Sequence, residues 1–288
     1  MKKLLMISWA AVACAIGAVP ILAQASPASD LKDFRAYFFK KFPGVSLQEF
    51  SNGVYAIDKN RRLEWEAMEE FPPYEPALDI GKELFEKPFK NGKTYSSCFK
   101  NGGIGIRQNY PYFNKRTGKV KTLAAEINQC RVKNGEKKLK WKKGKLAAII
   151  AYMSYTSRGK KVNVIVPNDS RAIAIYNRGK TSFYAKRGQL NFSCADCHVY
   201  NSGMMARSNL LSPALGHVSH FPVYRKKWEF KGKGALGGLG TIQRRYGGCN
   251  KQVRAKPFKA QSAEYTALEY FHTYMSNGIK INAPGVRQ

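Results

Sequence analysis

The chain has 288 residues and is strongly basic, with 49 lysines and arginines against 19 aspartates and glutamates and a formal net charge of +30. This length allows two domains of ordinary size or one large one. In a cytosolic protein, the charge would suggest a nucleic acid partner. In an exported protein, it suits an anionic substrate or an acidic partner better, so an export signal would argue against nucleic acid.

The first 25 residues have the pattern of a secretory signal peptide. Lys2-Lys3 precedes an apolar stretch over residues 4–22, and Ala23-Gln24-Ala25 provides a small-x-small cleavage site. A glycine and a proline interrupt the apolar stretch, and no other segment approaches membrane-spanning length. We expect residues 1–25 to be removed on export, leaving no membrane anchor. A retained N-terminal anchor is the alternative.

Similar runs of residues occur in the two halves of the chain. Gly81-Lys82-Glu83-Leu84-Phe85 precedes Ser97-Cys98, and Gly179-Lys180-Thr181-Ser182-Phe183 precedes Ser193-Cys194. The similarity of these runs indicates that one unit has been duplicated.

The end of each half supports the same duplication. Leu146 precedes Tyr152-Met153-Ser154, and Leu268 precedes Tyr274-Met275-Ser276 with the same internal spacing. A glycine suited to ending a helix follows each run. The spacing of apolar residues after Leu146 predicts a buried helix.

The second half contains a C-x-x-C-H motif, Cys194-Ala195-Asp196-Cys197-His198. This pattern is typical of covalent haem c attachment, in which the two thiols add to the haem vinyl groups and the histidine binds the iron. A chance match and a thioredoxin-like cysteine pair are the alternatives. The export signal favours haem.

The first half has no such motif, because Phe99, Lys100 and Asn101 follow Cys98. We therefore expect one haem c per chain. In an oxidising compartment Cys98 and Cys130 are free to form a disulfide. This disulfide would close a loop of about thirty residues, which stabilises the fold by roughly 3 kcal/mol if the bond is unstrained.

A helix leading into the haem-binding turn and a final helix packing back on it are typical of a small cytochrome c domain. We therefore predict a mainly α-helical protein of two tandem cytochrome c-like domains with long irregular loops, the first domain without haem. The expected boundaries are 26–160 for an N-terminal extension and the haem-less domain, 161–178 for a connecting segment, and 179–288 for the haem-binding domain.

The second axial ligand of the iron has several candidates. They are the methionines, histidines and remaining cysteine of the second half: Met204, Met205, Met275, His217, His220, His272 and Cys249. The two adjacent methionines follow the motif too closely to reach the opposite face easily. Met275 has a counterpart, Met153, in the half without haem, so a core position suits it better. Each histidine is also suited to a structural role.

Cys249 lies in a distinctive run, Gln243-Arg244-Arg245-Tyr246-Gly247-Gly248-Cys249. Nearby positive charge lowers the pKa of a thiol and favours the thiolate, which is the better ligand and nucleophile. Arginines also hold oxyanions through forked hydrogen bonds. An inert buried cysteine is the alternative.

Three parts of the second half resemble the SoxA family, the cytochrome c subunits of the periplasmic sulfur-oxidising (Sox) system. They are the run Arg187–His198, the run Phe221–Arg225 with Trp228, and the run Gln243–Arg245 with Cys249. The similarity extends over most of the mature chain. The sequence resembles the single-haem form, in which the first domain keeps the fold without the cofactor.

The resemblance implies a set of site residues. His198 and Cys249 would be the axial ligands of the iron, and the cysteine is often a persulfide in this family. Arg245 would be the active-site arginine, although its neighbour Arg244 falls in the same run. Cys194 and Cys197 would attach the haem.

The resemblance also implies an activity, that of an L-cysteine S-thiosulfotransferase in the periplasm. Thiosulfate is joined oxidatively to a cysteine thiol of the carrier SoxYZ, and the electrons pass through the haem of a SoxX subunit, the partner in a heterodimer, to a small cytochrome c. Three alternatives stay open. They are a plain electron-transfer cytochrome, a non-catalytic assembly subunit, and a thiosulfate dehydrogenase that forms tetrathionate.

Overall fold

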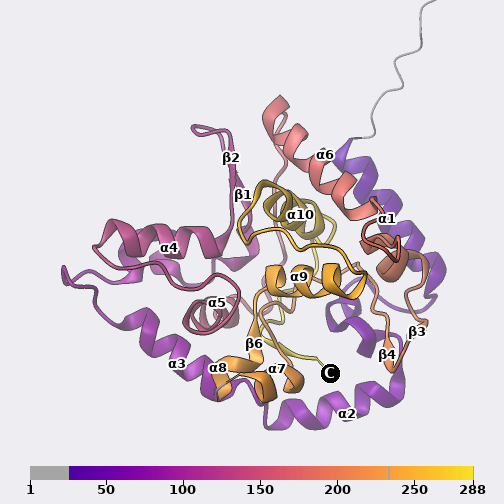
Figure 1. Ribbon diagram of the computed structural model, residues 1–288, viewed down its shortest axis with the longest axis horizontal. Coiled ribbons are helices and arrows are strands. Elements are labelled where there is room, and N and C mark those ends of the chain that lie inside the picture. Colours follow the sequence, from indigo (N-terminus) through magenta and orange to yellow (C-terminus); the bar gives the residue numbers. More distant parts are fainter. Residues whose placement is uncertain (1–25, 233, 288) are drawn as a thin grey trace, which may run out of the picture.

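The structure, a computed structural model, describes residues 26–232 and 234–287 and is mainly helical, as the sequence predicts (Figure 1). The expected signal peptide, residues 1–25, lies outside the described residues. Within the described ranges, no helix combines the length and the apolar character that crossing a membrane requires.

The α-helices of this part of the chain are short to medium in length. Their bounds are α1 (Pro27–Lys41), α2 (Lys59–Glu70), α3 (Glu75–Glu86), α4 (Leu123–Lys133), α5 (Lys145–Tyr155), α6 (Ser170–Tyr184), α7 (Lys226–Lys231), α8 (Ala235–Gly238), α9 (Ile242–Gln252) and α10 (Ala263–Tyr274). Shorter turns of 3-10 helix and one π-helical turn join them. These are η1 (Glu49–Ala56), η2 (Tyr95–Cys98), η3 (Lys100–Gly103), η4 (Arg107–Asn109) and the π-helical η5 (Asp196–Tyr200).

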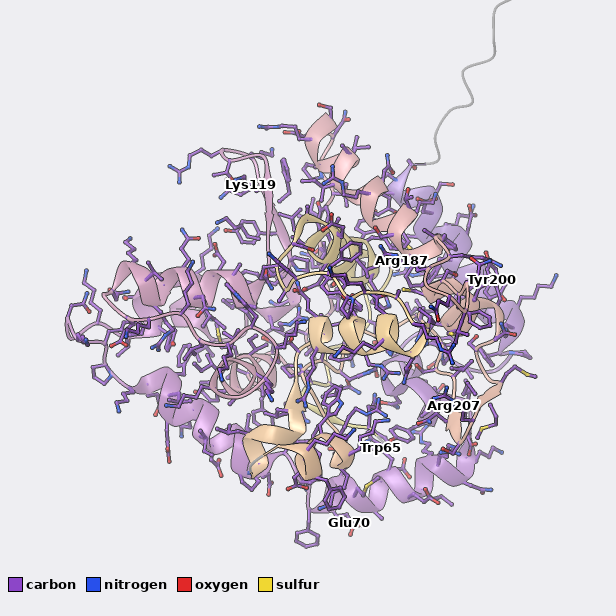
Figure 2. The ribbon with its side chains drawn as sticks, viewed as in Figure 1. Trp65, Glu70, Lys119, Arg187, Tyr200 and Arg207 are labelled. Atoms are coloured by element: carbon purple, nitrogen blue, oxygen red, sulfur yellow. A yellow bond between two sulfur atoms is a disulfide. The ribbon has the colours of Figure 1, made fainter. Side chains whose placement is uncertain are left out.

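The strands are only two or three residues long and form three small sheets. Their bounds are β1 (Tyr112–Asn114), β2 (Lys119–Lys121), β3 (Met205–Ala206), β4 (Asn209–Leu210), β5 (Val223–Tyr224), β6 (Leu239–Gly240) and β7 (Gly285–Val286). β1 and β2 form an antiparallel hairpin that projects from the body, with Lys119 on it (Figure 2). β3 and β4 form a second hairpin. In the third sheet, β5 lies between antiparallel β6 and parallel β7.

Two pairs of helices pack with their backbones in close contact, and each contact depends on a glycine. A Cβ atom added to Gly81 in α3 would lie 2.2 Å from the carbonyl oxygen of Ala148 in α5. A Cβ atom added to Gly179 in α6 would lie 2.1 Å from the carbonyl oxygen of Ala267 in α10. Real Cβ atoms do not approach so closely, so only glycine fits at either crossing. The repeated Gly-Lys run of the sequence marks the same packing in both halves.

Each closing helix is followed by a glycine, as the sequence predicts. α5 ends at Tyr155, and Gly159 beyond it has a φ of +79°. α10 ends at Tyr274, and Gly278 beyond it has a φ of +78°. Glycine adopts this left-handed conformation without the steric cost that a Cβ atom imposes.

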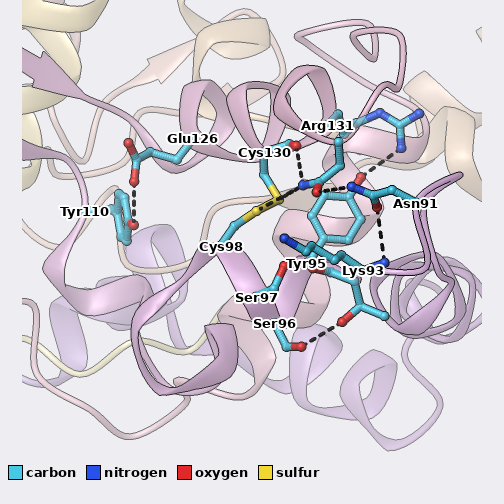
Figure 3. The surroundings of a disulfide bond; sticks show 12 residues. Asn91, Lys93, Tyr95, Ser96, Ser97, Cys98, Tyr110, Glu126, Cys130 and Arg131 are labelled. Carbon is cyan, nitrogen blue, oxygen red and sulfur yellow. Dashed lines mark hydrogen bonds between the residues drawn. A yellow bond between two sulfur atoms is a disulfide. The ribbon is translucent and has the colours of Figure 1, made fainter.

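A disulfide between Cys98 and Cys130 confirms the pairing predicted for the first half (Figure 3). It joins η2 to α4 within the apolar cluster that contains both cysteines. The Asn134 side chain donates a 2.8 Å hydrogen bond to the carbonyl of Cys130. Arg131, next in α4, donates to the Tyr95 hydroxyl at 3.0 Å and pairs with Glu136. This bonding organises the turn that follows α3, where the second half instead carries its C-x-x-C-H motif.

The N-terminal extension packs on the second half, although the sequence joins it to the first. Phe34 and Phe38 of α1 are buried in the same apolar cluster as Phe183 of α6. Asp30 accepts hydrogen bonds from Lys180 at 2.6 Å and from the Tyr176 hydroxyl at 2.9 Å, both on α6. The extension therefore covers the helix that leads to the C-x-x-C-H motif.

The segment expected to connect the halves, residues 161–178, is only partly extended. Val162 exchanges backbone hydrogen bonds with the turn after α10, donating to Ile279 and accepting from Gly278. The Asp169 side chain accepts a hydrogen bond from the backbone N–H of Arg171 and caps α6. Helix α6 thus begins at Ser170, inside the expected connection, because an aspartate supplies the N-terminal cap there.

Replacing Gly179 with alanine tests the close helix crossing. We expect Gly179→Ala to lower the free energy of unfolding by roughly 1–3 kcal/mol, because the added methyl group must push α6 away from α10. Gly81→Ala is expected to act similarly on the α3–α5 pair. Gly248→Ala is the control, since nothing lies within 4 Å of the Cβ position at this glycine. Urea denaturation gives the three values, and equal stability of Gly179→Ala and the control would contradict the packing argument.

Candidate functional site

The C-x-x-C-H motif lies on one helical turn that Ser193 and Asp196 fix. The backbone N–H and the hydroxyl of Ser193 donate to the Asp196 carboxylate at 2.7 and 2.8 Å. The Asp196 N–H donates back to the Ser193 hydroxyl at 2.9 Å. This reciprocal cap is a capping box with an aspartate in place of glutamate. Because Cys194 and Cys197 are three residues apart on the capped turn, their thiols share one face.

His198 is oriented by a backbone carbonyl. Its Nδ1 lies 2.9 Å from the carbonyl oxygen of Ser212. A carbonyl can only accept, so Nδ1 carries the proton and Nε2 is left as the ligating nitrogen. The sequence contains no local signal for this partner, because Ser212 belongs to the loop beyond the β3–β4 hairpin.

Cys249 meets His198 from another element. It lies on α9, and both it and His198 line the same cavity. Arg245 lies one helical turn before Cys249 and therefore on the same face of α9. The fold thus brings together His198, Cys249 and Arg245, the residues that the sequence singled out.

A cavity lies beside these residues and is walled mainly by apolar and aromatic side chains. Six of them are Phe183, Phe221, Ile242, Phe258, Tyr265 and Leu268. The space between the wall atoms is about 630 Å³, part of it open to solvent. Cys194, His198 and Cys249 also line it. Two thiols on one turn, a free imidazole nitrogen and apolar walls are the donor set and surroundings that suit a covalent haem.

The cysteines differ in their expected protonation. Burial raises the pKa of the Cys194 thiol to about 12. Burial acts in the same direction on Cys249, but the positive charge of Arg245 and the nearby His198 and Arg225 side chains outweigh it and lower its pKa to about 7. A substantial fraction of Cys249 is therefore thiolate at neutral pH, the form that ligates and attacks.

The neighbouring arginines, Arg244 and Arg245, have different surroundings. The Arg244 guanidinium lies 4.0 Å from the ring centroid of Trp228. It donates hydrogen bonds to the carbonyls of Gly237 and Leu239 at 2.9 and 2.6 Å. Arg245 instead lines the cavity with Cys249. The sequence could not separate the two, because only the direction of the helix face decides which one reaches the cavity.

The methionine candidates for the second axial position lie away from Cys249. Met204 and Met205 are 61% and 54% exposed, in and beside the β3–β4 hairpin. Met275 is buried in the core at the end of α10, as its counterpart in the first half suggested.

The four histidines of the chain form one cluster, which the sequence does not reveal. The His217 ring lies 4.8 Å from that of His198, 5.5 Å from that of His220 and 5.4 Å from that of His272. His217 and His272 line the cavity, and each has one buried ring nitrogen without a hydrogen-bond partner. His220 instead contacts the carbonyl of Ser51 through Nδ1. Buried polar atoms normally have a hydrogen-bond partner, so these two ring nitrogens indicate that the cavity holds a group or water that bonds to them.

Comparison with known proteins gives a consistent match. The chain is 52% identical over 265 residues to "L-cysteine S-thiosulfotransferase subunit SoxA" of Chlorobaculum thiosulfatiphilum, covering 92% of this chain and 89% of that protein. It is 48% identical to the protein of the same name from Allochromatium vinosum, covering 92% of this chain and 91% of the relative. This chain belongs to the SoxA family of L-cysteine S-thiosulfotransferase subunits.

A solved structure and a family model agree with this assignment. The structure titled "Crystal structure of SoxXA from P. pantotrophus" matches with a TM-score of 0.66 and 30% identity, over 75% of this chain and 79% of that one. The family model described as "SoxA/TsdA, cytochrome c domain" matches residues 80–162. These residues include the Cys98–Cys130 disulfide and precede the C-x-x-C-H motif, so the half without the motif is the one matched to a cytochrome c domain.

Alanine substitutions separate the two arginines of this SoxA chain. We expect Arg244→Ala to lower the free energy of unfolding by about 2 kcal/mol, because it removes two hydrogen bonds and the stacking on Trp228. Arg245→Ala removes none of these contacts and should cost less. Thermal or urea denaturation of both variants provides the measurement. A greater loss of stability for Arg245→Ala would show that the geometry around Trp228 is wrong.

Proposed function

We propose that this protein is the catalytic haem subunit that joins thiosulfate oxidatively to a cysteine thiol of a SoxYZ-type carrier protein. It would act in the periplasm as a heterodimer with a SoxX-type cytochrome c subunit. Membership of the SoxA family supports the reaction, and the likeness to a SoxXA structure supports the partner. The observation that carries the proposal for this chain is the meeting of Cys249, His198 and Arg245 beside one apolar cavity.

The proposed cofactor is a single haem c. Cys194 and Cys197 would attach it, and His198 and Cys249 would ligate its iron. When bound, the haem supplies a one-electron acceptor beside the Cys249 sulfur, for electrons that pass to the SoxX haem and on to a small cytochrome c. The residues Phe99, Lys100 and Asn101 after Cys98 support one haem rather than two.

Two tandem cytochrome c-like domains are the proposed architecture. The first would occupy residues 26–160 together with the N-terminal extension, and the second residues 179–288. The repeated glycine crossings of α3 with α5 and of α6 with α10 support the duplication. The match of the cytochrome c family model to residues 80–162 supports the first domain.

The proposed chemistry has two steps at Cys249. In the first, the Cys249 thiolate and the terminal sulfur of thiosulfate form an S–S bond, and two electrons leave. In the second, the carrier thiolate attacks the sulfur that was the terminal sulfur of thiosulfate. The bond from this sulfur to Cys249 breaks, and the Cys249 thiolate is released. The sum converts thiosulfate and a carrier thiol into a carrier S-thiosulfonate, one proton and two electrons. A persulfide on Cys249 would lengthen the attacking group by one sulfur without changing this balance.

The protein side chains have separate tasks in these steps. Arg245 would hold the anionic oxygens of thiosulfate by forked hydrogen bonds and orient its terminal sulfur. The same guanidinium lowers the pKa of Cys249 and so favours its thiolate form. Net positive charge over the chain would speed the encounter with a dianion.

Replacing Cys249 tests the function directly. We expect Cys249→Ala to abolish thiosulfate-dependent transfer to the carrier, followed by mass spectrometry of the carrier cysteine, while the haem stays attached. Electron paramagnetic resonance of the oxidised protein should lose a thiolate-type low-spin signal in the same variant. Met204→Ala is the matched control, because this exposed candidate ligand should leave both signals unchanged.

The other outcomes point to the alternative functions. Reversible reduction without any thiosulfate-dependent rate, together with a His/Met or bis-His signal, would favour a plain electron-transfer cytochrome. Transfer activity that survives Cys249→Ala would contradict the proposed role of Cys249. Tetrathionate formed without any carrier would favour a thiosulfate dehydrogenase. Partner binding without activity in the unaltered protein would favour an assembly subunit.

A further inference from the structure

Strand register places two arginines side by side next to the candidate site. β5 and β7 are parallel, with Val223 opposite Gly285 and Tyr224 opposite Val286. The next residues in the two strands are Arg225 and Arg287, and the N–H of Arg287 still donates to the carbonyl of Tyr224 at 2.9 Å. Paired positions of neighbouring strands face the same side of a sheet. The side chains of Arg225 and Arg287 therefore start from neighbouring backbone positions on that side.

Arg225 is buried, and one nitrogen of its guanidinium group has no hydrogen-bond partner. Its exposure is 7%, and the nitrogen without a partner is Nε. Its guanidinium lies over the Trp228 ring, 5.6 Å from the centroid. Burial lowers the pKa of Arg225 to about 10, and the neighbouring positive charges of Arg245 and Arg287 act in the same direction.

Arg287 is held in place but is also not neutralised. Its guanidinium donates to the carbonyls of Val286 and Ser51 at 2.6 and 3.4 Å and lies 5.0 Å from the Tyr55 ring centroid. Burial lowers the pKa of Arg287 to about 10, and the charge of Glu69 opposes this shift. The Glu69 carboxylate is engaged with the Trp65 N–H and the Tyr74 hydroxyl.

No carboxylate forms an ion pair with Arg225, Arg245 or Arg287 among the residues that the structure describes. Removing a charge from water without a partner costs several kcal/mol, and three like charges together cost more. The Cys249 thiolate offsets part of this cost at Arg245 and Arg225, and an anion that enters the pocket would offset more.

The three arginines line one pocket that adjoins the candidate site. Its wall also contains His198 and His217, and it shares both histidines and Arg245 with the apolar cavity. Arg61 lines the same pocket and pairs with Asp58. Arg245 therefore stands between Cys249 on one side and Arg225 and Arg287 on the other.

We propose that Arg225 and Arg287 form an oxyanion-binding site that adjoins Cys249 through Arg245. The ligand is a group with at least two anionic oxygens, matched to the forked donors of guanidinium. Two such groups can reach this pocket, the sulfonate end of thiosulfate and a haem propionate. The choice of these two sources rests on the proposed function, whereas the presence of an anion site rests on the buried Arg225 and the half-buried Arg287 that line one pocket.

The test compares Arg225→Gln and Arg287→Gln with Arg116→Gln in the holoprotein complex. Arg116 is an exposed arginine between β1 and β2, so its variant makes the same change of charge away from the pocket. Thiosulfate, and sulfate as an unreactive analogue, are titrated calorimetrically into each protein. If the sulfonate occupies the site, both pocket variants should bind at least about tenfold more weakly than the control, because a charged hydrogen bond is lost.

A propionate in the site gives a different result. Thiosulfate affinity should then stay at the control value, while the haem midpoint potential falls and its pH dependence changes in both pocket variants, because positive charge beside the propionate is removed. Either result supports the oxyanion site and identifies its ligand. Unchanged affinity and unchanged potential in Arg225→Gln and Arg287→Gln, relative to Arg116→Gln, would overturn it.

Two further variants keep the test independent of folding and of catalysis. Arg225→Lys keeps the positive charge but loses the paired N–H donors of the guanidinium group. We therefore expect its anion affinity or haem midpoint potential to lie between those of the unaltered protein and Arg225→Gln. This variant keeps the test valid if Arg225→Gln folds poorly. Repeating the titrations in a Cys249→Ser background removes turnover. Anion binding that persists there, but fails in the Arg225→Gln double variant, supports the site even if the proposed transfer reaction is wrong.

Discussion

The close crossing of α6 and α10 is the constraint on which the candidate site depends. Gly179 lets the two helix backbones touch at Ala267, and the helices then present Phe183, Leu268 and His272 to the same cavity. α6 leads directly to the capped turn that carries the cysteines, so its position also sets where the thiols lie. A larger residue at the crossing would separate the walls of the cavity, because packed helices do not compress.

Electrostatics in this region is arranged for anions rather than for stability. Arg225, Arg245 and Arg287 lie near one another with no acidic partner among the described residues. Their repulsion and desolvation oppose folding, and the surrounding carbonyls and aromatic rings offset only part of that cost. The same positive field lowers the pKa of Cys249, whose thiol would otherwise stay protonated in a buried position. One cluster of charges thus favours the thiolate of Cys249 and, in the proposed function, would also hold an oxyanion.

The two halves use different means to hold the turn after their first helix. In the second half the turn carries the C-x-x-C-H motif and faces the cavity. In the first half the Cys98–Cys130 disulfide ties the equivalent turn to α4, with Asn134 and Arg131 bonded around it (Figure 3). The covalent link limits the freedom of the unfolded chain there. The N-terminal extension adds apolar side chains to the second half, where α1 packs on α6.

The sequence by itself determined local features of this protein: the glycines that follow α5 and α10, the Cys98–Cys130 disulfide and the C-x-x-C-H run. It also singled out Cys249 as a candidate. These depend on spacing along one element or on cysteine chemistry, so they can be predicted without the fold. The tertiary structure decided which arginine faces the cavity, where α1 packs, and that four histidines meet. It also decided that Arg225 and Arg287 are neighbours, because the pairing of β5 with β7 joins residues far apart in the chain. Helix direction and strand register are long-range properties, and no local pattern of residues contains them.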